Sequence, residues 1–164
     1  MNTHVDEWVM SCPTIQHTRS LGSTLGEVAV VGCVVCLMGD LGAGKTTFAQ
    51  GVGQGLGVLD DVVSPTFVLI SEYEGRIPFL HADLYRLTAT ELDVLGLEEI
   101  LETCNGVAVV EWGDRFPVVF PVDRLEVKIH FEGEGRVLQV KATGTHHRSI
   151  LQAWRQRVVA TTSF

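Results

Sequence analysis

Cysteine is scarce in this sequence. Only four cysteines occur among 164 residues, at positions 12, 33, 36 and 104. So few thiols, so unevenly spaced, do not make the disulfide framework that stabilises small secreted domains, and we expect them to be reduced. Cys33 and Cys36 form a C-x-x-C pair, but they lie within an apolar run that predicts a β-strand. Residues three apart on a strand point to opposite faces, which argues against a zinc or redox pair.

Long apolar segments and an excess of basic charge are also missing. Although 46% of the residues are apolar, no run approaches the roughly 20 residues that span a membrane. The first residues, MNTHVDEWVMSCP, lack the basic and apolar regions of a signal peptide. We therefore expect a soluble, cytoplasmic protein with no membrane contact. The net charge of −8 repels nucleic acid, so any RNA contact would be local or carried by a partner protein.

The distribution of apolar residues predicts a single α/β domain over residues 1–164, with residues 1–12 as a flexible extension. Continuous apolar runs at 34–38 and 107–110 are typical of central parallel strands covered on both faces. Two antiparallel hairpins are predicted around glycine-containing turns, at 66–72 with 77–83 and at 125–131 with 136–141. Helical spacing is found at 20–31, 46–56, 88–102 in two pieces, and from His147 onward. These elements predict a three-layer sandwich with a mixed β-sheet.

The segment GDLGAGKT at residues 39–46 matches the phosphate-binding pattern G-x-x-x-x-G-K-[ST] between a predicted strand and a predicted helix. Glycines let such a loop wrap around an anion with its N–H groups pointing inward, and the following helix adds the positive end of its dipole. The expected fold is therefore similar to that of P-loop NTPases, with a bound nucleoside triphosphate. Lys45 would contact the β- and γ-phosphates, and the hydroxyl of Thr46 would bind Mg²⁺. Further nucleotide contacts are expected from Asp40, Leu41, Gly42, Ala43, Gly44 and Thr47.

Two acidic residues end apolar segments downstream of this loop. Glu111 follows the run VAVV, and Asp83 ends the segment FLHAD. In a P-loop protein an acid in this place can join the magnesium shell or orient the attacking water, and the sequence leaves open which acid does which. Asp83, Glu111 and Lys45 are the predicted catalytic residues, and Thr46 and Glu111 are the predicted metal ligands.

Three polar features near these acids have two interpretations each. Ser64-Pro65-Thr66 lies where other P-loop proteins keep a loop that senses the γ-phosphate, and the same residues fit the start of a strand equally well. Arg86 and Arg115 each follow a candidate acid. Either arginine could stabilise charge on the transferring phosphoryl group or pair with a nearby carboxylate.

Four segments in this order and spacing resemble the TsaE family, formerly YjeE: GDLGAGKTT, SPTF, HADLYRL and VVEW. The resemblance covers about residues 18–112 and extends loosely into the second hairpin. It implies the ATPase subunit required to form the threonylcarbamoyl group on N6 of adenosine 37 in tRNAs that read codons beginning with A. It also implies TsaB and TsaD as partner proteins, with tRNA contacted only through their complex. Hydrolysis is expected to be slow alone and stimulated by these partners.

The resemblance also assigns roles to residues by position. Glu111 matches the magnesium-linked acid of the family, Asp83 its catalytic aspartate, and Trp112 a tryptophan beside the site. A polar segment at 16–18, which includes Thr18, matches a segment that contacts the nucleotide base. Arg136 matches an arginine that closes over the nucleotide.

Other functions of a short P-loop domain remain alternatives. A small-molecule kinase would need an arginine-bearing lid, and only Arg76 and Arg86 lie between residues 72 and 101. A GTPase would need a base-reading N-K-x-D motif, which is missing, and the D-x-x-G match at 93–96 falls within a helical pattern. A nucleotide-sensing subunit with little hydrolysis is the third alternative. A kinase would consume ATP in proportion to an added acceptor, whereas the role implied by the family needs partner proteins instead.

Overall fold

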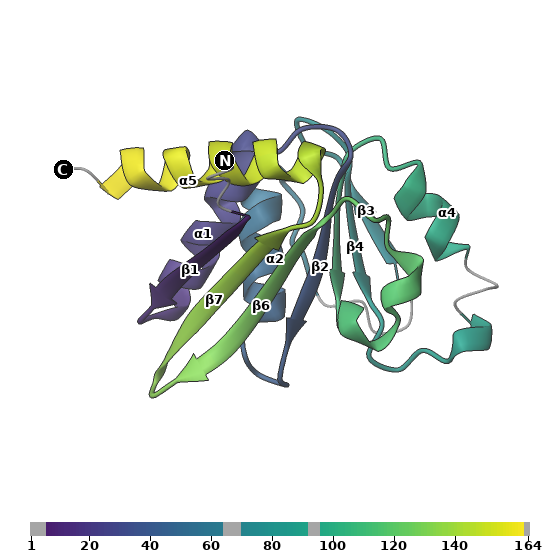
Figure 1. Ribbon diagram of the computed structural model, residues 1–164, viewed down its shortest axis with the longest axis horizontal. Helices are drawn as coiled ribbons and strands as arrows, with labels where there is room; N and C mark the ends of the chain where they lie inside the picture. Colours follow the sequence, from purple (N-terminus) through teal and green to yellow (C-terminus); the bar gives the residue numbers. More distant parts are fainter. Residues whose placement is uncertain (1–5, 64–69, 92–95, 163–164) are drawn as a thin grey trace, which may run out of the picture.

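The computed structural model describes residues 6–63, 70–91 and 96–162, without the side chain of residue 162. Within these ranges, one sheet contains seven strands in the order β1-β7-β6-β2-β5-β4-β3 (Figure 1). The strands are β1 (Glu7–Cys12), β2 (Cys33–Gly39), β3 (Ile70–Tyr73), β4 (Phe79–Asp83), β5 (Val107–Glu111), β6 (Leu125–Glu132) and β7 (Gly135–Ala142). The helices are α1 (Ile15–Val28), α2 (Lys45–Gly55), α4 (Leu97–Glu102) and α5 (Thr145–Thr162), with 3-10 turns η1 (Gly113–Arg115) and η2 (Pro117–Val119).

The centre of the sheet is parallel and its edges are antiparallel. Strand β2 pairs in parallel with β5 and β6, and β5 pairs in parallel with β4. The pairs β1–β7, β6–β7 and β3–β4 are antiparallel. Strand β5 is buried along its whole length and β2 along most of it, because helices cover both faces of a central parallel strand. The predicted α/β fold with a mixed sheet is confirmed.

Helices lie on both faces of the sheet, which gives the three predicted layers (Figure 1). Apolar residues of α1, α2 and α5 join one core cluster, and those of α4 and η2 join a second cluster on the other face. Cys33 belongs to the first cluster and Cys36 to the second, so the two thiols point to opposite faces as predicted. Burial raises the pKa of each thiol to about 12, which keeps both protonated and poorly nucleophilic.

Glycines bring α1 and α2 into close contact. A Cβ added at Gly51 of α2 would lie 2.1 Å from the carbonyl oxygen of Arg19, and one added at Gly55 would lie 2.0 Å from that of Ser23. Side chains therefore do not fit at these positions, and the backbones of the two helices touch. This contact holds α2 against α1, and the first turn of α2 carries the end of the glycine-rich loop.

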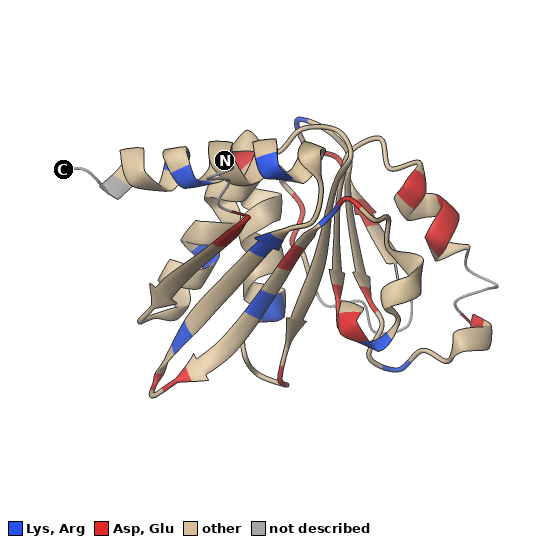
Figure 2. Ribbon diagram, in the orientation of Figure 1, with Lys and Arg blue, Asp and Glu red and all other residues tan. Residues whose placement is uncertain are grey.

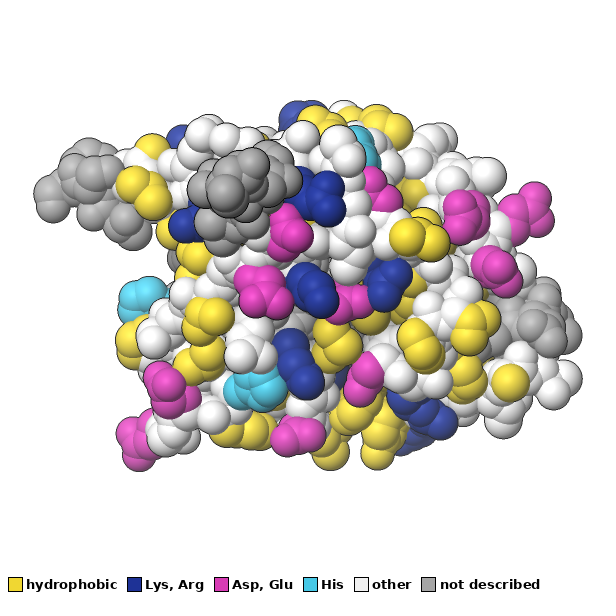
Figure 3. All heavy atoms as spheres, in the orientation of Figure 1, with side chains coloured by type: hydrophobic (Ala, Val, Ile, Leu, Met, Phe, Trp, Pro, Cys, Tyr) yellow, Lys and Arg dark blue, Asp and Glu magenta, His cyan; other side chains and the backbone are white. Residues whose placement is uncertain are grey.

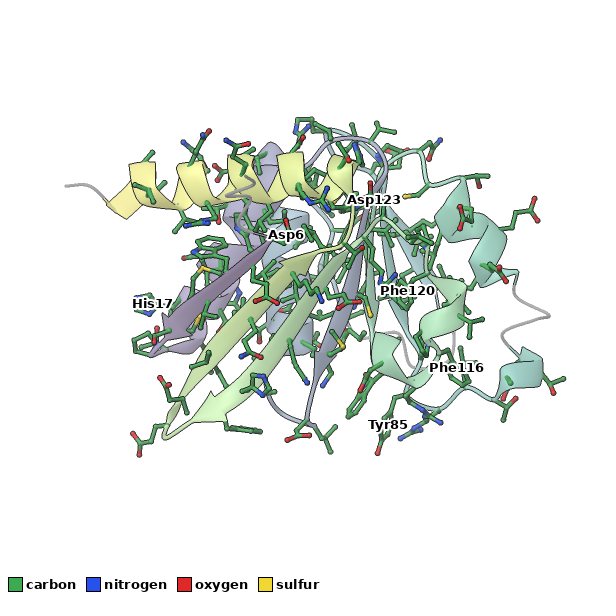
Figure 4. The ribbon with its side chains drawn as sticks, in the orientation of Figure 1. Asp6, His17, Tyr85, Phe116, Phe120 and Asp123 are labelled. Carbon is green, nitrogen blue, oxygen red and sulfur yellow. The ribbon has the colours of Figure 1, made fainter. Side chains whose placement is uncertain are left out.

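A buried histidine ties the first turn of α5 to the central strand. Nε2 of His147 accepts a hydrogen bond from the backbone N–H of Val34 at 2.9 Å. Its Nδ1–H donates to the carboxylate of Asp123 at 2.7 Å. Asp123, which lies beside the first turn of α5 (Figure 4), also accepts from the backbone N–H groups of His146 and His147. A neutral imidazole makes both hydrogen bonds, with Nδ1–H as the donor and Nε2 as the acceptor.

The prediction of a flexible extension at residues 1–12 is wrong for residues 7–12, which form β1. This strand pairs with β7 from Glu7 opposite Lys141 to Cys12 opposite Arg136. Cys12 is fully buried, and alternate residues of the strand pack against the core with it. The period-two alternation of EWVMSC buries one face of the strand, and that burial together with the pairing to β7 at the edge of the seven-stranded sheet offsets the lost chain entropy.

One predicted helix has different bounds, and one predicted hairpin is described only in part. Helix α1 begins at Ile15 and ends at Val28, earlier than the predicted range 20–31. Thr14 caps it, because its hydroxyl accepts a hydrogen bond from the N–H of His17 at 3.3 Å. The first predicted hairpin is present as β3 and β4, but the part of it at residues 66–69 lies outside the described residues.

Candidate functional site

Glycine shapes the loop between β2 and α2. Gly39, Gly42 and Gly44 have φ angles of 151°, 81° and 114°, which residues with a side chain rarely adopt. Helix α2 begins directly after Gly44, and no described side chain caps its first turn. The N–H groups at this end of α2 therefore face the space enclosed by the loop, where the helix dipole favours an anion. This is the backbone geometry of a phosphate-binding loop.

Lys45 crosses the mouth of the loop. Its side chain is buried, and its Nζ donates hydrogen bonds to the carbonyl oxygens of Gly39 at 2.6 Å and Asp40 at 2.9 Å. The ammonium group also lies 4.0 Å from the centroid of the Trp112 ring, a cation–π contact. Burial lowers the pKa of Lys45, while the carboxylates of Glu111 and other nearby acids act in the opposite direction. The loop thus holds a buried cation that can bind an anionic group.

Glu111 faces Thr46 across the carboxyl end of the sheet. Thr46 lies in the first turn of α2, and its Oγ1 is 3.1 Å from each carboxylate oxygen of Glu111. Glu111 ends β5 and is only 3% exposed. On its other side, Nε2 of His81 lies 2.5 Å from Oε2 of the same carboxylate. The predicted metal ligands, Thr46 and Glu111, are therefore in direct contact.

Asp83 lies beside Glu111 at the same edge of the sheet. The two residues are register partners on β4 and β5, because parallel strands end together. Oδ1 of Asp83 accepts a hydrogen bond from the backbone N–H of Tyr85 at 2.9 Å, and the side chain is half-buried. The structure thus brings together Lys45, Thr46, Asp83 and Glu111, which come from three segments far apart in the sequence.

The residue after Glu111 has an unusual backbone. Trp112 has φ of 59° and ψ of 33°, and it is the only non-glycine residue with positive φ among those that the structure describes. Such a conformation is strained for a bulky residue and often marks a functional site. Its ring contacts Tyr85, with ring centroids 4.7 Å apart, and Tyr85 lies at the edge where β4 ends (Figure 4). The strained turn therefore places an aromatic pair next to Lys45.

Arg136 reaches the loop from β7. Its Nε donates to the carbonyl oxygen of Ala43 at 2.9 Å, and its Nη2 donates to that of Gly42 at 3.2 Å. The guanidinium stacks on the ring of Phe131, 4.3 Å from the centroid. The predicted nucleotide-contacting arginine is thus at the loop, where it holds two carbonyl oxygens.

The polar segment at 16–18 lies at the start of α1. Gln16 is exposed, whereas Thr18 is buried, with its methyl group against Gly44 of the loop. Thr47, the last residue predicted to contact nucleotide, lies half-buried in the first turn of α2. Thr18 therefore packs behind the loop, and Gln16 is the more accessible of the two polar side chains.

The other candidates are placed differently. Arg86 is exposed beyond β4, and the guanidinium of Arg115 lies 5.5 Å from the centroid of the Phe116 ring. The structure does not bring either arginine into a described contact with the phosphate loop. The segment Ser64-Pro65-Thr66 and residues 93–95 of the D-x-x-G match lie outside the described residues.

The donor atoms at Thr46 and Glu111 fit a magnesium ion. A hydroxyl and a carboxylate supply hard oxygen ligands, and Mg²⁺ commonly takes only one or two protein oxygens together with nucleotide phosphates. In the described ranges, no group of three or more His, Cys, Asp or Glu side chains could hold a metal ion without such help. The residues present therefore suit an ion that arrives with its nucleotide.

The predicted site omits one residue, His81. The sequence contains it in the segment HADLYRL, but a histidine inside an apolar strand carries no signal of its contact. Its position two residues before Asp83 places it on the same face of β4, and this spacing is the one clue that sequence offers. The pairing of β4 with β5 then brings it to Glu111.

No helix in the described part of the chain is long and apolar enough to cross a membrane.

Comparisons with known proteins identify the family. The sequence model of the family described as Threonylcarbamoyl adenosine biosynthesis protein TsaE matches residues 12–138. The tRNA threonylcarbamoyladenosine biosynthesis protein TsaE of Nostoc sp. is 47% identical over 124 residues, covering 73% of this chain and 76% of that protein. Its counterpart in Bacillus subtilis is 37% identical, covering 84% and 87%. The crystal structure of Bacillus subtilis YdiB superposes with a TM-score of 0.79 at 29% identity, over 94% of this chain and 98% of that one. The chain belongs to the TsaE family.

Proposed function

We propose that this protein is a magnesium-dependent ATPase that serves the biosynthesis of threonylcarbamoyladenosine in tRNA. The observation that carries the proposal is the convergence of Lys45, Thr46, Asp83 and Glu111 at the carboxyl end of the central strands. Phosphate-binding loops are common to many activities. Two carboxylates beside the loop add the groups that hydrolysis requires.

Each residue has a distinct part in this proposal. The loop N–H groups and Lys45 bind the phosphates, and the positive charge of Lys45 offsets negative charge that develops during phosphoryl transfer. Thr46 and Glu111 would hold Mg²⁺, which neutralises phosphate charge when bound. Asp83, on the neighbouring strand, is left to orient the attacking water. The contact between Thr46 and Glu111 supports this division, because it joins the two oxygen donors.

The role in tRNA modification comes from the family. The relatives carry the name tRNA threonylcarbamoyladenosine biosynthesis protein. TsaB and TsaD are the proposed partners, with hydrolysis slow alone and stimulated by their complex. A function in tRNA modification would place the protein in the cytoplasm.

The surface charge supports indirect contact with tRNA. Basic and acidic residues are interspersed along β6 and β7 (Figure 2), and side chains of both signs lie on this face of the molecule (Figure 3). Lys128 and Lys141 are exposed there, with Glu126 on the same face. Because tightly bound phosphates require clustered basic charge, this face does not favour a tRNA backbone. The proposal therefore assigns tRNA binding to the partner proteins.

A metabolite kinase is less consistent with the contacts of Arg76. This arginine, one of the two available for a lid, donates to the carbonyl oxygens of Gly26 and Ala29 at 2.7 and 2.8 Å. It caps the end of α1 and is thus already engaged. Only Arg86 is left in that region for a second phosphorylated substrate.

Hydrolysis of ATP should be measured with Mg²⁺ or EDTA, alone and with TsaB and TsaD, along with threonylcarbamoyladenosine formed on tRNA. We expect magnesium-dependent hydrolysis that rises when both partners are present, and loss of both activities in Lys45→Ala. Lys128→Ala, an exposed lysine on β6, is the matched control and should retain both. Stimulation by a metabolite without any partner protein, in step with its own phosphorylation, would contradict the proposal.

A further inference from the structure

His81 is buried directly beside the carboxylate of Glu111. Its side chain is 0% exposed, and its Nε2 lies 2.5 Å from Oε2 of Glu111. It stands in the middle of β4, opposite Val109 of β5 and Ser71 of β3. The ring is parallel to that of Phe79, with centroids 6.4 Å apart and an interplanar angle of 4°. Two strands and an aromatic ring thus hold the imidazole in one orientation.

The second ring nitrogen determines which tautomer is present. Nδ1 of His81 is buried and has no hydrogen-bond partner within the described residues. A buried N–H without an acceptor loses the full energy of its hydrogen bonds to water, so any form of the ring with a proton on Nδ1 is disfavoured. A ring with its proton on Nε2 avoids this loss, because Nδ1 then has no hydrogen to donate. The proton therefore lies between His81 and Glu111, and the histidine donates.

This hydrogen bond distinguishes the two oxygens of Glu111. Oε2 contacts both His81 and the Thr46 hydroxyl, whereas Oε1 contacts the Thr46 hydroxyl, which lies 3.1 Å from each oxygen. With Oε2 engaged by His81, the rotation of the carboxylate is restricted, and Oε1 stays beside the Thr46 hydroxyl. Hydrogen bonds of this kind to metal-binding carboxylates commonly orient the ligand and adjust its basicity.

We propose that His81 is a positioning residue that orients the Glu111 carboxylate for Mg²⁺ and nucleotide through its Nε2–H. This inference rests on the proposed function, since it gives Glu111 its task. His81 itself touches neither substrate nor metal. Its loss should therefore act through Glu111 and through nothing else.

Two substitutions separate the hydrogen bond from the packing. His81→Leu replaces the hydrogen-bond donor with an apolar side chain of similar size, whereas His81→Gln keeps an N–H at about the position of Nε2. We expect kcat for ATP hydrolysis to fall about 10- to 100-fold in His81→Leu, the usual effect of losing such a partner, with recovery in His81→Gln. The affinity for a fluorescent ATP analogue measured without Mg²⁺ should not change, while the gain in affinity on adding Mg²⁺ should shrink.

A double-mutant cycle tests whether the effect of His81 on hydrolysis depends on Glu111. In a Glu111→Ala background, His81→Leu should cause no further loss of kcat, because coupled residues are not additive. Equal losses in both backgrounds would overturn the proposal, because they would show that His81 acts by packing alone. An unchanged kcat and magnesium response in His81→Leu would overturn it as well.

The tautomer can be measured on the unmodified protein without nucleotide. Nitrogen-15 NMR of the histidine rings should show a proton on Nε2 of His81 and none on Nδ1, and the N–H signal should shift in Glu111→Ala. A proton on Nδ1 would overturn the proposal. If the leucine variant does not fold, the glutamine variant and this spectrum decide the question. Absence of hydrolysis by the unmodified protein would instead refute the proposed function, and the spectrum would still report the contact.

Discussion

Gly51 in α2 should not tolerate a side chain. A Cβ at this position would lie 2.1 Å from the carbonyl oxygen of Arg19 and 3.0 Å from the N–H nitrogen of Ser23, both in α1. The first distance is more than about 1 Å short of an ordinary van der Waals contact. Both obstacles are backbone atoms of a helix, so rotation of a side chain cannot relieve the clash. In Gly51→Ala, α1 and α2 must separate.

The magnitude follows from two opposing effects. Overpacking of a close contact costs roughly 1–3 kcal/mol, and a clash between backbones belongs at the upper end of that range. Alanine recovers about 1 kcal/mol relative to glycine through its helix propensity. We expect Gly51→Ala to lower the free energy of unfolding by about 2 kcal/mol, which in a domain of this size lowers Tm by roughly 4–8 °C.

Gly53→Ala is the matched control. Gly53 lies in the same helix, but a Cβ there would meet side chains of Val62 and Phe79 at 2.8 and 3.4 Å, which can move. Thermal and urea denaturation followed by circular dichroism should show a smaller loss for Gly53→Ala than for Gly51→Ala. If Gly51→Ala is as stable as the unmodified protein, the inference that the backbones of α1 and α2 touch at Gly51 is wrong. Reduced nucleotide affinity in the same variant would confirm that this contact also positions the first turn of α2.

Three further predictions concern the site and its support. Asp83→Ala and Glu111→Ala should each slow hydrolysis about 100-fold or more while ATP still binds in a calorimetric titration; unchanged rates in both would remove these acids from the site. Arg136→Ala should weaken ATP binding about 3- to 10-fold, because each lost hydrogen bond contributes on the order of 1 kcal/mol, whereas Arg155→Ala on α5 should not. Burial lowers the pKa of His147 below its ordinary value of 6.5. Just below pH 6.5, the histidine therefore binds a proton in the unfolded chain but stays neutral in the folded protein. The free energy of unfolding should therefore be fully present above about pH 6.5 and fall as the pH is lowered from there. Urea denaturation between pH 5 and 8 checks this, and His147→Gln should flatten the slope; an unfolding energy that rises on acidification would refute the sign.

Local patterns predicted much of the fold. The apolar runs of β2 and β5 identified the central strands. A strand buried on both faces is a continuous apolar run, which is easy to recognise in a sequence. Strand β1 was missed, although its alternation was visible, because six residues of edge strand carry a weak signal without a partner. The partner is β7, more than a hundred residues later in the chain, and only the tertiary structure brings the two together.

The sequence by itself determined the phosphate loop, since glycines, Lys45 and Thr46 are adjacent along the chain and their geometry depends on local backbone conformation. It also pointed to Asp83 and Glu111 as strand-end acids. Their meeting with Thr46 depended on the parallel pairing of β4, β5 and β2. The contacts of His81 and Arg136 were decided by the tertiary structure alone. The physical reason is that hydrogen bonds between distant segments depend on which strands pair and in which register, and a short local pattern does not contain that information.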